Sequence, residues 1–264
     1  MSDATAQESG TVQPPGQQSA VRYVQLTVPR HRPVWTYVLL TINVLVFALM
    51  TVLGGSENPA VLVLFGAKYQ PLIAQGQYWR LLTANFIHIG LLHLAMNLYA
   101  LYVFGLQVER RFGRARFILL YLLSGIAGTA LSYVGSRALS AGASAAIFGL
   151  IGAITAYYVI HRRMFGTVGY RQLRGLLIVM GINLVMGLTS PQIDNLGHLG
   201  GLLAGSALGW AYCPRYAVAR GMEGLPELQE RKQGARPAAT TVGMVAVLVA
   251  LSLLGTWLHT GAAH

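Results

Sequence analysis

Long apolar runs, separated by short segments that contain arginine, dominate the chain. A membrane-spanning helix needs about 20 consecutive apolar residues, and seven runs approach or reach that length. They cover residues 34–54, 91–106, 115–135, 144–160, 172–189, 195–213 and 240–258. The second and fourth runs are short, and a Ser/Gly stretch, Ser140 to Gly142, immediately precedes the fourth. Short spans flanked by glycine indicate non-helical backbone that enters the membrane beside a protein-lined cavity.

The runs divide the chain into four parts. We predict that residues 1–32 form a disordered cytoplasmic leader, because the first twenty residues are polar and aperiodic, and that the leader is not a secretory signal. Residues 33–213 hold six runs, 214–237 form a basic cytoplasmic linker, and 238–264 hold the seventh run and a short external tail. We therefore predict an all-α, polytopic membrane protein with a six-helix core and one additional C-terminal transmembrane helix. The stretch from residue 54 to 90 is too long for a simple turn and predicts a structured external element.

Composition agrees with a membrane protein. Apolar residues make up 54% of the chain and charged residues 10%, against roughly 25% charged residues in a soluble domain. This composition excludes a disordered chain and an ordinary soluble globule. The single cysteine, Cys213, excludes an intramolecular disulfide and a zinc site built from cysteines.

The distribution of positive charge predicts the orientation. A net charge of +11 in a soluble protein would suggest a nucleic-acid partner. Here, sixteen of the 19 Lys and Arg residues fall on one side of the seven predicted spans, and Lys68, Arg80 and Arg137 fall on the other. Because cytoplasmic loops carry the excess of Lys and Arg, we expect a multi-pass plasma-membrane protein with a cytoplasmic N-terminus, an external C-terminus and no nucleic-acid partner.

Four polar residues lie at membrane depth, where such side chains are costly and mark candidate functional sites. They are His93, Asn97, Ser144 and His198. The predicted orientation places all four in the outer half of the bilayer, at similar heights. His93 and Asn97 are four residues apart and therefore share one helical face.

Glycines on the sixth run suggest how two of these residues meet. His198, Gly201 and Gly205 share a face, and the Gly201-to-Gly205 spacing allows a neighbouring helix to approach closely. If the fourth run packs there, Ser144 comes within hydrogen-bond reach of His198. Phe148 lies one helical turn after Ser144.

Each of these residues also has a purely structural interpretation. The alternatives are small-residue packing for Ser144, cross-helix hydrogen bonding for His198 and Asn97, interfacial anchoring for His93, His88, Trp79 and Arg80, and close helix packing for Gly201 and Gly205.

A serine in contact with a histidine provides a nucleophile and its general base. Attack on an amide carbonyl develops negative charge on oxygen, which fixed hydrogen-bond donors stabilise. The candidate donors are the Asn97 amide, the His93 ring and the backbone N–H of Ser144, which is free at the start of a helix. Asp194 lies four residues before His198 at the water boundary, and we favour a two-residue dyad over a triad.

Four segments together resemble the motifs of the rhomboid family of intramembrane serine proteases. They are Gly142-Ala-Ser-Ala-Ala-Ile-Phe-Gly149, His88-Ile-Gly-Leu-Leu-His-Leu-Ala-Met-Asn97, Gly197-His-Leu-Gly-Gly201 continuing to Gly205, and Trp79-Arg80. The resemblance runs from about residue 34 to 213, with matching order and spacing.

The resemblance implies a role for each matched residue. Ser144 would be the nucleophile and His198 the base, with His93 and Asn97 stabilising the oxyanion. Phe148 would stack against the His198 ring. The pair Trp79-Arg80 would belong to the first external loop. His88 is a candidate for bringing water to the site.

Two positions depart from the family pattern. Ala145 follows the nucleophile where the family usually has glycine, and we expect its methyl group to narrow the space beside Ser144. Phe148 stands where tyrosine is common, so the ring is kept and the hydroxyl is lost.

The predicted function is an intramembrane endopeptidase that needs no metal or cofactor. Its partners would be transmembrane protein substrates and the lipid bilayer, and the sequence predicts no oligomeric state. One alternative is an inactive rhomboid-like binder of membrane proteins in trafficking or quality control. Another is a transporter or proton relay, for which the chain lacks inverted repeats.

Overall fold

The computed structural model describes residues 28–189, 193–220 and 226–260. Residues 1–27 of the predicted disordered leader and the end of the tail, 261–264, lie outside this range. Residues 28–32 of the leader are described, and the His31 N–H donates to the Arg110 carbonyl at 2.8 Å. The elements in chain order are α1 (Trp35–Val52), α2 (Pro59–Phe65), α3 (Gln70–Ala74), α4 (Arg80–Thr83), η1 (Ala84–Phe86), α5 (Leu91–Ala100), η2 (Leu101–Gly105), α6 (Leu106–Phe112), α7 (Arg114–Gly135), α8 (Ser144–Ile160), α9 (Arg162–Thr189), α10 (Asn195–Tyr212), β1 (Tyr216–Arg220), β2 (Pro226–Glu230) and α11 (Arg236–Thr260).

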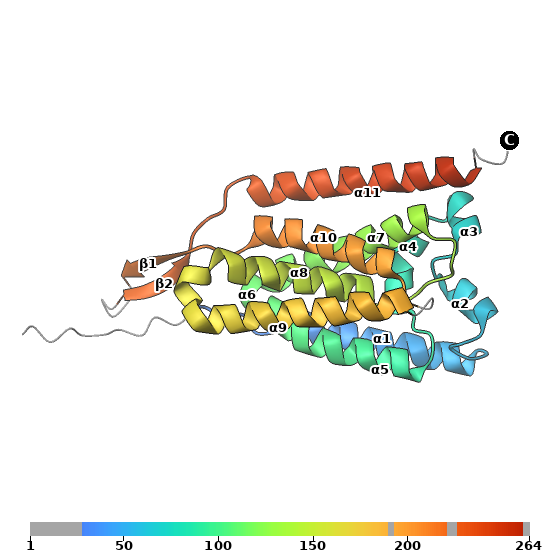
Figure 1. Ribbon diagram of the computed structural model, residues 1–264, viewed down its shortest axis with the longest axis horizontal. Helices are drawn as coiled ribbons and strands as arrows, with labels where there is room; N and C mark the ends of the chain where they lie inside the picture. The colour runs from blue at the N-terminus through green and yellow to red at the C-terminus, as the bar shows by residue number, and fades with distance from the viewer. Residues whose placement is uncertain (1–27, 190–192, 221–225, 261–264) are drawn as a thin grey trace, which may run out of the picture.

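The long helices run side by side along the long axis of the molecule, with α8 and α10 in the middle (Figure 1). α8 packs against α10, α7 and α9, and most of its side chains are buried. On the outside of the bundle, α9 and α11 leave large apolar side chains such as Leu188 and Trp257 exposed. Apolar surfaces of this extent are typical of helices that face lipid.

Within the described residues, five helical segments are long and apolar enough to cross a membrane: α1, the continuous segment Leu91–Phe112, α7, α9 and α11. α8, with 17 residues, is shorter, and the glycine-rich α10 has 18. The predicted all-α, polytopic membrane fold is therefore confirmed, and the count of seven spans stays a prediction.

Two predicted helix boundaries were wrong. The second span continues through the π-helical stretch η2 and α6 to Phe112 instead of ending near residue 106. α9 begins at Arg162, not near residue 172, and its backbone bends at Gly166, where φ is 48°. Arginine is a good helix former, so basic residues expected in loops extend the helices instead. The segment predicted as a linker also contains an antiparallel hairpin, in which β1 pairs with β2.

Glu109 holds the beginning of α1. Its side chain is fully buried and accepts hydrogen bonds from the backbone N–H groups of Val34, Trp35 and Thr36 at 2.8, 2.9 and 2.8 Å. The Thr36 hydroxyl donates a fourth bond at 2.7 Å. The first N–H groups of a helix have no partner within the helix and form its positive end. A buried carboxylate from α6 therefore completes α1.

The predicted structured element between residues 54 and 90 is confirmed, and it contains α2, α3, α4 and η1. The buried Arg80 side chain holds it together. Its Nη1 donates to the carbonyl oxygens of Val63 and Ala67 at 2.7 and 3.2 Å, and its Nε donates to Gln77 at 2.8 Å. The guanidinium also lies 4.6 Å from the Trp79 ring centre. The Trp-Arg pair thus fixes the shape of residues 54–90, which we call the external segment after the side of the membrane predicted for it.

Lys68 joins this external segment to the bundle. Its fully buried ammonium donates to Ser132 Oγ at 3.0 Å and to the Ser136 carbonyl at 2.9 Å. The Ser132 hydroxyl in turn donates to Asp194 Oδ2 at 2.6 Å. One chain of hydrogen bonds therefore connects the α2–α3 loop, α7 and the beginning of α10.

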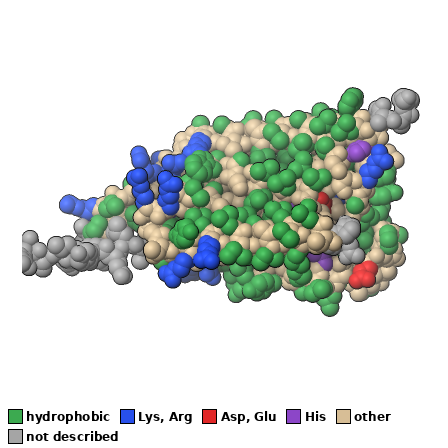
Figure 2. Space-filling view, in the orientation of Figure 1, with side chains coloured by type: hydrophobic (Ala, Val, Ile, Leu, Met, Phe, Trp, Pro, Cys, Tyr) green, Lys and Arg blue, Asp and Glu red, His purple; other side chains and the backbone are tan. Residues whose placement is uncertain are grey.

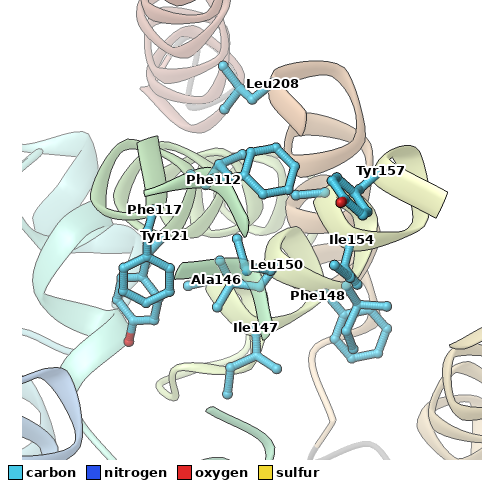
Figure 3. Close-up of a cluster of buried hydrophobic side chains, with 14 of the residues drawn as sticks. Phe112, Phe117, Tyr121, Ala146, Ile147, Phe148, Leu150, Ile154, Tyr157 and Leu208 are labelled. Carbon is cyan, nitrogen blue, oxygen red and sulfur yellow. The ribbon is translucent and has the colours of Figure 1, made fainter. Parts of the chain in front are cut away.

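The largest buried cluster surrounds α8 (Figure 3). Its Leu150 and Ile154 belong to the same cluster as Phe112 of α6 and Phe117 and Tyr121 of α7. Between helices in a membrane, close packing replaces the hydrophobic effect as the main attraction. This cluster therefore sets the position of α8 and of the residue at its beginning, Ser144.

Candidate active site

Ser144 is the first residue of α8 and is half-buried. The external segment holds the two residues before it. The Gly142 N–H donates to the Ala84 carbonyl at 2.9 Å, and the Ala143 N–H donates to His88 Nε2 at 3.3 Å. Gly142 has a φ of 139°, in the region that favours glycine. The backbone that leads into Ser144 is thus fixed from outside its own helix.

His88 accepts the Ala143 hydrogen bond as a neutral ring, because an imidazole nitrogen that accepts carries no proton. The residue is fully buried, and burial lowers its pKa to about 3. The ring of His93 lies 5.5 Å away between centres. This burial argues against an exposed interfacial anchor, and His88 instead supports the segment before Ser144.

His93 of α5 borders the same space as Ser144. A Cβ placed on Gly142 would lie 2.7 Å from Cε1 and 2.9 Å from Nε2 of His93, and 3.8 Å from Ser144 Oγ. Glycine at position 142 therefore leaves room for both the His93 ring and the Ser144 hydroxyl, which border the same space.

Asn97 lies one turn after His93 and is buried. Its Nδ2 donates to the His93 carbonyl at 2.9 Å, which leaves the second amide hydrogen free. Between described residues, no hydrogen bond links Asn97 to Ser144 or His198. Asn97 therefore shares the helical face predicted for it without a direct bond to the proposed dyad.

His198 of α10 stacks on Phe148 of α8. The ring centres are 4.3 Å apart and the ring planes differ by 7°. Phe148 follows Ser144 by one helical turn, so the imidazole lies beside the beginning of α8. Only 7% of His198 is exposed, and its buried Nδ1 has no hydrogen-bond partner among the described residues. In the same part of the chain, no hydrogen bond joins His198 to Ser144.

Asp194 is a helix cap in this structure. Its Oδ1 accepts from the Gly197 N–H at 2.9 Å, and its Oδ2 accepts from the Ser132 hydroxyl. Both carboxylate oxygens thus have other partners, and the geometry favours a dyad over a triad.

Glycines allow α10 to pack closely against α8. A Cβ on Gly201 would collide with the Ala145 carbonyl oxygen, and a Cβ on Gly205 would collide with the Gly149 backbone. These contacts fit the close packing predicted for the glycine face. Ala145 fits because its methyl group faces Gly128 of α7. A Cβ added to Gly128 would lie only 2.7 Å from that methyl group. The methyl group is accommodated there by a glycine of the neighbouring helix.

Sequence reasoning missed the roles of Glu109 and Lys68. Both are ionisable residues beside apolar runs. By sequence, Lys68 counts only as a positive charge on the external side, and Glu109 has no assigned role. Burying a charge is costly unless the charge has partners, so an ionisable residue beside an apolar run predicts such partners. They are the α1 N–H groups for Glu109 and Ser132 for Lys68. The sequence does not name those partners, because they lie far along the chain.

One open surface groove lies between α1 and α5, and another lies at the ends of α8 and α10. Neither is lined by Ser144 or His198. Among the described residues, no three His, Cys, Asp or Glu side chains gather closely enough to hold a metal ion.

Comparison with known proteins decides the family. The family model described as the rhomboid domain matches residues 75–215. The chain belongs to the rhomboid family. The rhomboid protease GluP of Bacillus subtilis is 46% identical over 175 residues, which cover 66% of this chain and 34% of GluP. Rhomboid-like protease 1 of Toxoplasma gondii is 34% identical over 225 residues, which cover 80% of this chain and 74% of that protein.

A plant rhomboid relative, the mitochondrial RHOMBOID-like protein 6 of Arabidopsis thaliana, is 37% identical over 162 residues, 58% of this chain and 52% of that protein. The match to GluP thus spans about a third of that protein. The predicted family is confirmed. Membership and the protease names of two relatives support a multi-pass membrane protein with protease activity at the level of the family.

Proposed function

We propose that this rhomboid is an intramembrane serine endopeptidase in which Ser144 is the nucleophile and His198 the general base. The observation that carries the proposal is the stacking of His198 on Phe148, one turn from Ser144. The glycine contacts of α10 with α8 support it, because they hold the two helices close at this height. His198 and Ser144 are 54 positions apart in the sequence, so a contact between them depends on the packing of α10 against α8.

The first step is acylation. The Ser144 hydroxyl attacks the carbonyl carbon of the scissile peptide bond while His198 takes the hydroxyl proton. The resulting tetrahedral intermediate carries its negative charge on the former carbonyl oxygen. When the carbon–nitrogen bond breaks, protonated His198 gives the proton to the leaving amine, and an ester to Ser144 remains.

The oxyanion needs donors that are fixed before the reaction. The Ser144 backbone N–H is suited to this role, since the first N–H groups of α8 lack partners within the helix. The His93 ring beside Gly142 and the second amide hydrogen of Asn97 are the other candidates. Holding Ala143 through His88 keeps the Ser144 N–H in place.

Hydrolysis completes the cycle. A water molecule gives a proton to His198 and attacks the ester carbonyl, and His198 then returns a proton to Ser144 Oγ as the carbon–oxygen bond breaks. The products are a carboxylic acid and the free serine. No proton acceptor beyond His198 is needed.

The substrates we propose are segments that cross the membrane. Such a segment must leave helical form at the cleaved bond, because a helix engages its carbonyl groups in hydrogen bonds. Small or helix-breaking residues are therefore expected near the cleavage site.

We also propose that the chain spans the plasma membrane seven times, with the N-terminus in the cytoplasm and the C-terminus outside. In this arrangement residues 33–213 form the six-span core, 214–237 the cytoplasmic linker and 238–264 the seventh span with its tail. Lys and Arg side chains gather at the end of the bundle where β1 and β2 lie (Figure 2). That end would face the cytoplasm under the positive-inside rule.

The activity test uses the purified full chain in lipid nanodiscs with a fluorescent single-span substrate. Ser144→Ala is expected to abolish cleavage, and His198→Ala to slow it by roughly 10²–10⁴, the usual contribution of a general base. Ser140→Ala is the matched control, since it removes a neighbouring hydroxyl and should cleave at the parent rate. Parent-like cleavage by Ser144→Ala would overturn the mechanism.

An inactive membrane-protein binder gives a different result. The parent protein would then bind the substrate without cleaving it, and Ser144→Ala would bind it equally well.

A further inference from the structure

A groove of about 500 Å³ opens where the ends of α8 and α10 meet the first turn of α9. Three arginines line it: Arg162, Arg163 and Arg215. His161 and apolar side chains, among them Met164 and Trp210, complete the lining. The groove lies in the basic end of the molecule (Figure 2) and on the far ends of the helices that carry Ser144 and His198.

The three arginines are exposed, and none of their guanidinium groups has a hydrogen bond or an ion pair with another described residue. Other arginines at this end of the bundle do have partners. Arg116 pairs with Glu230 at 2.6 Å, and Arg111 donates to the Tyr158 hydroxyl at 3.0 Å. No acidic residue lines the groove. Its positive charge is therefore uncompensated within the part of the chain that the structure describes.

The apolar part of the lining indicates what kind of anion fits. Met164 and Trp210 are 42% and 47% exposed beside the arginines. Tryptophan is enriched where a membrane protein meets the headgroup region. A free phosphate would contact only the guanidinium groups, whereas a phospholipid would also place its glycerol and acyl chains against the apolar side chains.

We propose that this groove binds the headgroup phosphate of an anionic phospholipid. Arginine forms paired hydrogen bonds with phosphate oxygens, and basic pockets between transmembrane helices are suited to anionic headgroups. The bound lipid would contact α8, α9 and α10 together. It would thereby stabilise the arrangement in which α10 packs on α8.

The test measures lipid binding by the purified full chain in detergent. Phosphatidylglycerol, phosphatidylcholine and inorganic phosphate are titrated separately. Retained lipid is counted by native mass spectrometry, and the thermal unfolding midpoint is followed in parallel. We expect phosphatidylglycerol to be retained and to raise the midpoint, because a ligand of the folded state stabilises it. Phosphatidylcholine and inorganic phosphate should do neither at the same concentration.

The variant is the triple substitution Arg162→Gln, Arg163→Gln and Arg215→Gln. Each arginine near a membrane surface contributes roughly fivefold to binding of anionic lipid, so the three together should account for about 100-fold. The matched control removes the same number of exposed charges outside the groove: Arg114→Gln, Arg171→Gln and Arg174→Gln. We expect the control to keep the parent affinity within about fivefold, the value of one such arginine.

A single variant, Arg215→Gln, covers the case in which the triple variant does not insert or fold, and it should lose about fivefold. Equal retention of phosphatidylglycerol by the groove variants and the control would overturn the proposal. So would an inorganic phosphate response equal to that of phosphatidylglycerol, which would assign the groove to a free anion.

Discussion

His88 connects the external segment to the beginning of α8 through one hydrogen bond, from the Ala143 N–H to its Nε2. The ring must be neutral for this bond to exist. Burial lowers the pKa of His88 to about 3, from 6.5 in an exposed histidine, and the ring of His93 is a titratable neighbour 5.5 Å away. Protonation of His88 in acid therefore breaks this hydrogen bond and destabilises the native position of Ala143 and of Ser144 after it.

We expect the protein to be less stable in acid because of His88. Between pH 6.5 and 3 the unfolded state binds a proton at His88 and the folded state does not, so stability is lost as the pH falls through this range. At pH 5 the loss is about 2 kcal/mol in the free energy of unfolding. His88→Gln should be less stable than the parent at pH 7.5 but should lose less between pH 7.5 and 5. Unfolding in mixed micelles at several pH values checks this. Equal pH dependence in the two proteins would contradict the role of His88.

At the scale of elements, one hydroxyl of α11, that of Thr256, contacts both the external segment and α7. Thr256 Oγ1 lies 2.8 Å from the Tyr78 hydroxyl, 3.1 Å from the Tyr133 hydroxyl and 3.0 Å from the Ser252 carbonyl oxygen. A carbonyl oxygen only accepts, so Thr256 donates to Ser252 and both tyrosines donate to Thr256. His259 adds a bond to the Tyr133 carbonyl at 2.9 Å. The last helix thus fixes the segment that contains Trp79 and Arg80.

Thr256→Val keeps the shape of the side chain and removes both acceptor sites. We expect it to lower the free energy of unfolding by about 2 kcal/mol, because two tyrosine hydrogen bonds are lost and each is usually worth about 1 kcal/mol. Thr256→Ser should restore parent stability. The control is Thr260→Val, because the Thr260 hydroxyl bonds only within α11. Equal destabilisation by the two valine variants, measured by thermal unfolding in one detergent, would show that the contact with the tyrosines contributes nothing.

At the scale of the whole molecule, the sequence predicts the features that depend on local pattern. Apolar runs located the long helices, and the glycine spacing at Gly201 and Gly205 anticipated the close contact of α10 with α8. Their similar predicted depth in the membrane makes Ser144 and His198 candidates for one site. These features are readable because each depends on residues a few positions apart.

Features that depend on distant partners were not predictable in the same way. The buried positions of Glu109 and Lys68 depend on groups in α1 and α7 that no local pattern names. The β1–β2 hairpin has no alternating apolar pattern to reveal it, and the early beginning of α9 at Arg162 was hidden by its basic residues. In each case a tertiary contact or a helix end, not the apolar run, decides the structure.

The central claim is that the hydroxyl of Ser144 is activated by His198, and its most direct test is reaction with a fluorophosphonate. The adduct is located by mass spectrometry of the labelled full chain in nanodiscs, and the rate is compared between the parent, His198→Ala and the control Ser140→Ala. The account predicts a single adduct on Ser144, a parent-like rate for Ser140→Ala, and a rate reduced by roughly 10²–10⁴ in His198→Ala. An adduct on another serine, or labelling of His198→Ala at the parent rate, would contradict it.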